Sequence, residues 1–181
     1  KNEEFQKKAS EEFKNCRVKK EYVAAVKGIV SEEFSVNEPI ITLKNRGGAF
    51  SKISPNGKEA FSHVTPVMVA GKKSLVKVEI KTGRTHQIRV HLASLNRHIL
   101  GDALYGFKSE KDKIGRVMLH AYGLYFTHPR TGGQMSFVAP IWDDFSEILL
   151  SKFSKENIDE KIDFMGLSEL FSHCDEWMRI L

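Results

Sequence analysis

One short stretch, residues 81–92, holds the residues best suited to chemistry. Its sequence, KTGRTHQIRVHL, places two arginines and two histidines within eight positions and contains no acidic residue. Arg89 is expected near the start of a helix, on a stripe away from the helix's own apolar face. A guanidinium fixed in this way suits a planar anion, either a carboxylate or a phosphate. The alternative is a polar helix start whose charged residues only cap the helix or face solvent, because short motifs also occur by chance.

The residues around this stretch predict a strand, a turn and a helix that position it. Before the stretch, apolar residues alternate with charged ones, which indicates a half-buried strand. Its apolar face is Val76, Val78 and Ile80, and its charged face is Lys77, Glu79 and Lys81. Thr82-Gly83 ends the alternation, and from Thr85 onward the apolar residues recur at helical spacing.

The same stretch resembles the signature of a known family. TGRTHQIRVH, followed by ILGDALYG at residues 99–106, is similar to the pseudouridine synthases of the RluA-like branch, which isomerise uridine in ribosomal and transfer RNA. The strand beginning with Lys19-Lys20 and the hairpin FTHPRTG at residues 126–132 match further family patterns. Two departures are mild: Ser62 stands where threonine is usual, and Asn96 where glycine is common. The resemblance covers about residues 5–142.

The resemblance implies the roles of the catalytic residues. The central group would be an aspartate in an H-R-L-D motif, which this sequence does not contain. We expect that aspartate upstream of Lys1, so the chain alone should be inactive. Tyr22 would pack on a flipped uracil and relay a proton at its C5 atom, and Arg89 would pair with the aspartate. Asp102 is the tempting substitute, but its Gly-Asp context favours a structural turn. The family needs neither a metal nor another cofactor.

Several basic residues are candidates for RNA binding. The candidates are Lys72, Lys73, Lys81, Arg84 and His86. Each lysine and arginine could equally be a solvated surface charge. For His86 and His120 we favour hydrogen bonds that position the site over direct contact with RNA. A zinc site does not fit, because the histidines lack the usual spacing and neither cysteine is near them. No serine or cysteine has the context of a hydrolase nucleophile.

Composition and charge agree with a nucleic-acid partner. The chain has 181 residues, 41% of them hydrophobic, a net charge of +5 and a pI near 9.1. Residues 72–101 contain seven lysines and arginines and one acidic residue, whereas residues 142–181 contain ten acidic residues and four basic ones. Two distant cysteines suit a reduced, cytoplasmic protein. No apolar run is long enough for a membrane span, and no signal peptide is evident, so we expect no membrane partner. We expect the protein to bind RNA and to be a monomer.

The pattern of elements predicts an α+β fold, with a mixed, mostly antiparallel sheet and packed helices. Residues 1–142 would be the C-terminal part of a pseudouridine synthase catalytic domain, and residues 143–181 a helical C-terminal extension that packs back on it. The expected elements are a helix over 3–16 packed on the core, a strand over 22–26 covered on both faces, a short strand over 40–43, a strand over 61–70 broken by Pro66, a hairpin of 124–126 with 134–138, and helices over 145–153 and 167–181.

Two other functions remain open. The first is a non-catalytic RNA-binding module that kept the scaffold but lost the aspartate. The second is an interaction protein that works through its acidic helical tail. The sequence encoded upstream of Lys1 separates the first alternative from an enzyme, and deletion of residues 143–181 tests the second.

Overall fold

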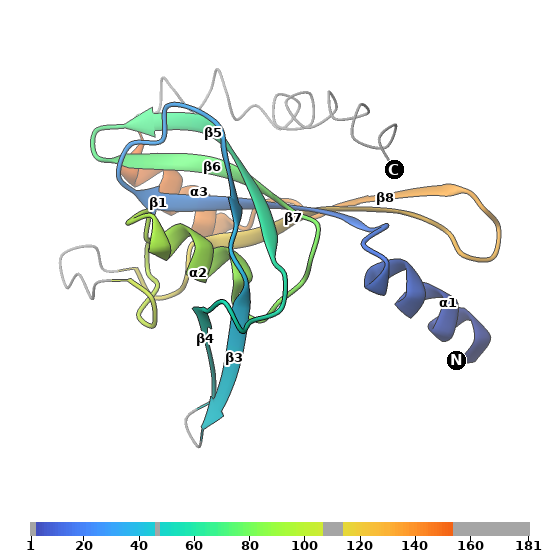
Figure 1. The fold of residues 1–181 in the computed structure, drawn as a ribbon. Coiled ribbons are helices and arrows are strands. Elements are labelled where there is room, and N and C mark those ends of the chain that lie inside the picture. The colour runs from blue at the N-terminus through green and yellow to red at the C-terminus, as the bar shows by residue number, and fades with distance from the viewer. Residues whose placement is uncertain (1–2, 46–47, 107–113, 154–181) are drawn as a thin grey trace.

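The computed structural model describes residues 3–45, 48–106 and 114–153, and its centre is a six-stranded sheet with the order β2-β5-β6-β1-β7-β8 (Figure 1). Every pairing of these described strands is antiparallel. The strands are β1 (Lys19–Lys27), β2 (Phe34–Asn37), β5 (Phe61–Ala70), β6 (Lys73–Ile80), β7 (Leu119–Thr127) and β8 (Gln134–Val138). A separate two-stranded sheet contains β3 (Ile40–Asn45) and β4 (Gly48–Ile53). The helices are α1 (Glu3–Lys14), α2 (Gln87–Ser94) and α3 (Asp143–Lys152). The predicted α+β class is confirmed.

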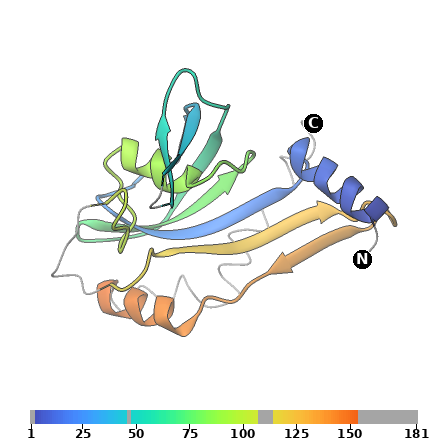
Figure 2. The ribbon, with the colours of Figure 1, turned by 90° about the horizontal axis from the view of Figure 1, so that it is seen from below.

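Helices α2 and α3 lie on opposite faces of the large sheet (Figure 2). The α2 face is identified by Ser62 on β5, whose hydroxyl oxygen lies 3.1 Å from Nε2 of Gln87 in α2. The opposite face is identified by His120 on β7, whose ring centroid lies 6.3 Å from that of Phe145 in α3. The strand register therefore shows whether a side chain of the large sheet points to the α2 face or to the α3 face.

The core contains β1 at its centre, as its apolar run predicts. Val23, Ala24, Ala25 and Val26 are completely buried, so both faces of this strand are covered. Helix α3 joins the same core through its buried side chains Phe145 and Leu149, and Phe153, the residue after the helix, is buried there too. The predicted helix over 145–153 therefore packs back on the sheet, as expected. The helix expected over 167–181 lies outside the described residues.

The charged face of β6 differs from the prediction of a half-buried strand. Lys77 is only 6% exposed, and its ammonium lies 2.8 Å from a carboxylate oxygen of Glu79 on the same face. On the neighbouring strand β1, the ammonium of Lys19 lies 3.0 Å from a carboxylate oxygen of Glu21, which is completely buried. The opposite charges stabilise one another within each strand and between the two strands, so these charged side chains can be buried. The alternation of residues along one strand cannot reveal this compensation.

Helix α1 was predicted to pack on the core, and this prediction is wrong. None of its twelve described residues is buried. Phe5 contacts His128 beside the β7–β8 turn, with ring centroids 5.3 Å apart, and Phe13 is 49% exposed. The helix lies near the tip of the β7–β8 hairpin, away from the centre of the sheet (Figure 1). The other phenylalanine of its apolar stripe, Phe13, has its ring centroid 5.8 Å from the ammonium of Lys20.

Several local predictions are confirmed. The pairing of β5 with β6 shifts register between Pro66 and Met68, which is the bulge that a proline in a strand suggests. Asn96, which stands where the resemblance makes glycine common, adopts the left-handed conformation that asparagine tolerates, with φ 57°. The β7–β8 hairpin forms as expected. Strands β2 and β4 were not predicted. No described helix has the length and apolar character that crossing a membrane requires.

Candidate active site

The start of α2 is held against β5 by one side chain, Gln87, which is 2% exposed. Its amide nitrogen donates to the backbone oxygen of Phe61, at 2.8 Å. Its amide oxygen accepts hydrogen bonds from the Thr82 hydroxyl at 2.8 Å and from the backbone N–H of Arg84 at 3.0 Å. The preceding residue, His86, has φ 55°, so the helix begins at Gln87, two residues later than the spacing predicts. These contacts fix the direction in which the first turn of α2 presents its side chains.

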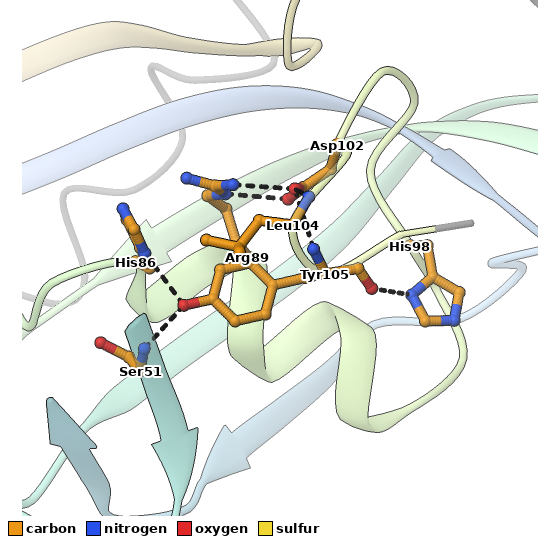
Figure 3. Close-up of polar contacts among 7 residues, drawn as sticks. All are labelled: Ser51, His86, Arg89, His98, Asp102, Leu104 and Tyr105. Carbon is orange, nitrogen blue, oxygen red and sulfur yellow. Dashed lines mark hydrogen bonds and ion pairs between the residues drawn. The ribbon is translucent and has the colours of Figure 1, made fainter. Parts of the chain in front are cut away.

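Arg89, in the first turn of α2, forms a bidentate ion pair with Asp102 (Figure 3). Nε donates to Oδ2 and Nη2 donates to Oδ1, both at 2.8 Å. The Asp102 side chain is 1% exposed, and its Oδ1 also accepts the backbone N–H groups of Leu104 at 3.0 Å and Tyr105 at 3.1 Å. Burial alone would raise the pKa of Asp102, but Arg89 and these N–H groups outweigh burial and hold the pKa below its ordinary value.

The ion pair assigns Asp102 a structural role and leaves one edge of Arg89 open. Both carboxylate oxygens of Asp102 accept hydrogen bonds, as the predicted turn requires, so this group is poorly placed to attack a substrate. Among the described residues, Nη1 of Arg89 has no hydrogen-bond partner, and the Arg89 side chain is 18% exposed. A guanidinium carries five N–H donors, so a second anion can bind at its free edge.

A glycine shapes the loop that carries Asp102. Gly101 has φ 72°, and a Cβ atom built there would overlap the backbone oxygen of Arg116. Only glycine fits this close approach in this conformation. The Gly-Asp pair of the motif therefore has a steric reason: glycine lets the loop turn, and aspartate then receives the guanidinium.

Tyr105 connects this ion pair to the β3–β4 sheet and to His86. Its hydroxyl oxygen lies 2.8 Å from the backbone nitrogen of Ser51 on β4 and 2.9 Å from Nδ1 of His86 (Figure 3). Its ring lies 4.9 Å from the guanidinium carbon of Arg89 and is stacked on the Phe50 ring. Burial lowers the pKa of His86, and the positive charge of Arg89 lowers it further although Asp102 opposes this, which favours the neutral imidazole at pH 7.

Tyr22 shares a face of the sheet with α2. Ser62, which bonds to α2, lies opposite Ile80, and Ile80 lies opposite Lys20. Residues paired directly across antiparallel strands point to the same side, and so do residues two apart in one strand. The Tyr22 side chain therefore lies on the α2 face. It is half-buried, and burial raises its pKa, so the phenol keeps its proton at neutral pH.

The five candidate RNA-binding residues fall into two separate groups. Lys81, Arg84 and His86 lie together in the turn between β6 and α2. Lys72 and Lys73 lie at the opposite end of β6, which a strand of this length places roughly 25 Å away. Nε of Arg84 donates to the backbone oxygen of Glu59 at 2.8 Å, which fixes the direction of its guanidinium.

Two other histidines, His120 and His91, do not join the site. His120 is on the α3 face, where its Nε2 lies 3.1 Å from the backbone oxygen of Ala139. It therefore does not position Arg89, contrary to what we favoured from the sequence. His91 is completely buried between the Ser62 hydroxyl and the backbone oxygen of Glu38.

Sequence reasoning missed two residues beside the site. Lys20 is 9% exposed and lies on the same face as Tyr22, where its ammonium donates to the backbone oxygen of Lys81 at 3.2 Å. Burial lowers its pKa. Tyr105 lies in the ILGDALYG motif, residues 99–106, for which the sequence predicted no role of this tyrosine. The only signal for it was its distance of three residues from Asp102 in that motif.

Comparison with known proteins gives a family match for the chain. Residues 1–94, just over half of the chain, match the family described as RNA pseudouridylate synthase. The chain belongs to this family. An uncharacterized RNA pseudouridine synthase of Helicobacter pylori strain J99 is 53% identical over 121 residues, which are 67% of this chain and 49% of that protein. The ribosomal large subunit pseudouridine synthase C of Buchnera aphidicola is 35% identical over 147 residues, which are 77% of this chain and 47% of that protein.

The fold has relatives among solved structures as well. Human RNA pseudouridylate synthase domain containing 1 superposes with a TM-score of 0.64 at 28% identity, over 77% of this chain and 61% of that chain. The resemblance to the RluA-like branch is thereby confirmed. The chain spans about half the length of the curated relatives it matches.

Proposed function

We propose that this chain supplies part of the active site of an enzyme that isomerises uridine to pseudouridine in ribosomal or transfer RNA. The observation that carries the proposal is Arg89, which Asp102 holds in a buried bidentate pair while one edge stays open on the Tyr22 face of the sheet. A solvated helix start would not require a buried carboxylate to orient its arginine. The family membership of the chain supports the same chemistry.

The open edge of Arg89 would bind the catalytic carboxylate. The reaction breaks the bond from the ribose to N1 of uracil and forms one to C5, while a proton leaves C5 and another reaches N1. A carboxylate acts on the sugar or the base during this exchange. An adjacent arginine lowers the pKa of an aspartate by about 1–3 units, which keeps it ionised, and also fixes its direction. We expect this aspartate upstream of Lys1, so residues 1–181 alone should form no pseudouridine.

Tyr22 would serve the flipped base. Uracil must leave its stack to reach the site, and a half-buried aromatic ring offers it a surface on which to pack. Because burial raises the pKa of Tyr22, its phenol is available as a neutral proton carrier near C5. In this scheme Tyr22 and Arg89 are the catalytic residues of the chain, and neither a metal nor another cofactor takes part.

Lys81, Arg84 and His86 would contact the RNA next to the target uridine, since they lie in the turn that leads into α2. Lys72 and Lys73 would contact a more distant part of the RNA, because they lie at the far end of β6. We place the protein in the cytoplasm as a monomer. Residues 1–142 would be the catalytic-domain part, and residues 143–181 its extension.

A non-catalytic RNA-binding module is the second candidate. It is favoured by one observation: among the described residues, the carboxylate that pairs with Arg89 is Asp102, whose oxygens already accept hydrogen bonds. The sequence encoded upstream of Lys1 distinguishes the two, because an H-R-L-D motif there supports the enzyme.

The test is an assay of pseudouridine formation by the full-length gene product on RNA from cells that lack the gene. Arg89→Ala and Tyr22→Phe should abolish turnover and leave RNA binding largely intact. Arg116→Ala is the matched control, since Arg116 forms a more exposed bidentate pair with Asp144 in the first turn of α3. Near-full turnover by Arg89→Ala would refute the role assigned to this residue.

A further inference from the structure

Tyr105 contacts four parts of the candidate site: strand β4, His86, Arg89 and the loop of Asp102. Its hydroxyl reaches β4 and the residue before α2, its ring lies beside Arg89, and its backbone belongs to the Asp102 loop. We propose that Tyr105 is a positioning residue that holds Arg89 in place and fixes His86 as a neutral donor through Nε2–H. This inference rests on the proposed function for its catalytic consequence, whereas its geometric part can be tested without turnover.

The hydroxyl of Tyr105 determines which nitrogen of His86 carries the proton. The backbone N–H of Ser51 can only donate, so the Tyr105 oxygen accepts that hydrogen bond, at 2.8 Å. Among the described residues the hydroxyl has no acceptor other than Nδ1 of His86, at 2.9 Å, so we assign its proton to that nitrogen. A neutral imidazole that accepts at Nδ1 carries its own proton on Nε2. Among the described residues Nε2 of His86 has no hydrogen-bond partner, so this donor is available to a ligand.

The ring of Tyr105 restrains Arg89 on a side that Asp102 does not reach. The guanidinium carbon lies 4.9 Å from the ring centroid, a distance typical of a cation–π contact. The ring is itself held by Phe50, with centroids 5.4 Å apart and an interplanar angle of 21°. Asp102 fixes one edge of the guanidinium and the aromatic ring restrains its plane, which leaves the Nη1 edge as the part open to an anion.

The backbone of Tyr105 is fixed as firmly as its side chain. Its N–H donates to Oδ1 of Asp102 at 3.1 Å, and its carbonyl oxygen lies 2.7 Å from Nδ1 of His98. The side chain also packs on a small apolar cluster formed by Ile40, Ala60 and Val90. A residue restrained at both its backbone and its side chain can hold its neighbours within the narrow tolerance that catalysis requires.

Tyr105→Phe tests this inference in the full-length gene product, because it removes the hydroxyl and keeps the ring. The first readout is the tautomer of His86, measured by the nitrogen chemical shifts of its ring. We expect a single Nε2–H tautomer in the parent protein and a mixture in the variant. The second readout is kinetic. The value of kcat should fall by roughly 10- to 100-fold while KM for RNA stays unchanged, because the substrate contacts remain and only the geometry loosens.

Tyr125→Phe is the matched control, since Tyr125 is a half-buried tyrosine of β7 on the α3 face, away from His86 and Arg89. It should change neither the His86 tautomer nor kcat. An unchanged tautomer in Tyr105→Phe would overturn the inference, and so would a mixed tautomer with full kcat. If the parent protein forms no pseudouridine, the proposed function fails, and the tautomer comparison still decides whether Tyr105 fixes His86.

Discussion

Asp102→Asn gives the sharpest prediction about the stability of the site. The substitution removes the negative charge that faces Arg89 and replaces an acceptor oxygen with an amide that donates toward Nε. The Asp102 side chain is 1% exposed and that of Arg89 is 18% exposed. Removing one partner of a fully buried ion pair costs about 3–5 kcal/mol. The partial exposure of Arg89, and the oxygen that asparagine retains for the backbone N–H groups, reduce our estimate to about 2–3 kcal/mol.

Urea or thermal unfolding measures this loss directly. A domain of this size loses about 2–4 °C of Tm per kcal/mol, so Asp102→Asn should lower Tm by roughly 4–12 °C. The loss also depends on pH. Because the pKa of Asp102 is lowered in the folded state, its stabilisation is complete above the ordinary aspartate pKa of about 3.9. It disappears as the pH falls through the folded-state pKa, so the parent and the variant should then converge.

The matched control for this experiment is Asp144→Asn, which disrupts the pair with Arg116. Those two side chains are 50% and 38% exposed, so solvent screens their interaction and we expect little change in stability. Equal effects of the two substitutions would refute the reasoning, because burial is what distinguishes the two pairs.

Two further predictions concern the loop and the buried histidine. Gly101→Ala should lower the free energy of unfolding by more than Gly71→Ala does. An alanine at residue 71 is strained by about 1–2 kcal/mol, but the new methyl group has open space around it. Equal losses of stability in urea unfolding would contradict the steric argument. Burial lowers the pKa of His91, although a hydrogen bond to a backbone oxygen partly opposes this. The free energy of unfolding should therefore fall as the pH drops below about 6.5, the ordinary histidine pKa. His91→Gln should reduce that dependence in urea unfolding at pH 7 and pH 5, and an identical slope in both proteins would contradict it.

The central strands could be predicted because their signals are local. The apolar run of β1, the Pro66 bulge and the turn chemistry of the β7–β8 hairpin each depend on residues that are neighbours in the chain. The fate of the apolar stripe on α1 was not predictable in this way. A stripe indicates that a helix can pack, but only the tertiary structure determines what it meets, and here its Phe5 meets the ring of His128.

The partners of site residues were the hardest to predict for the same reason. Arg89 was identified from its motif, but its pair with Asp102 joins residues thirteen apart across a loop. The burial of Lys77 depends on charge compensation within the sheet, and hydrophobic periodicity assigns every charge to solvent. The link from Tyr105 to Ser51 spans 54 positions. Local pattern therefore found the residue types of the site, and the fold determined how they are connected.

The most direct measurement is mass mapping of pseudouridine in RNA from cells that lack the gene, after they are supplied with the parent gene, the Arg89→Ala variant or the Arg116→Ala variant. The account predicts that at least one uridine stays unmodified in the deleted cells. The parent and Arg116→Ala genes should restore its modification, and Arg89→Ala should not. An unchanged pseudouridine map on deletion, or full restoration by Arg89→Ala, would contradict the account.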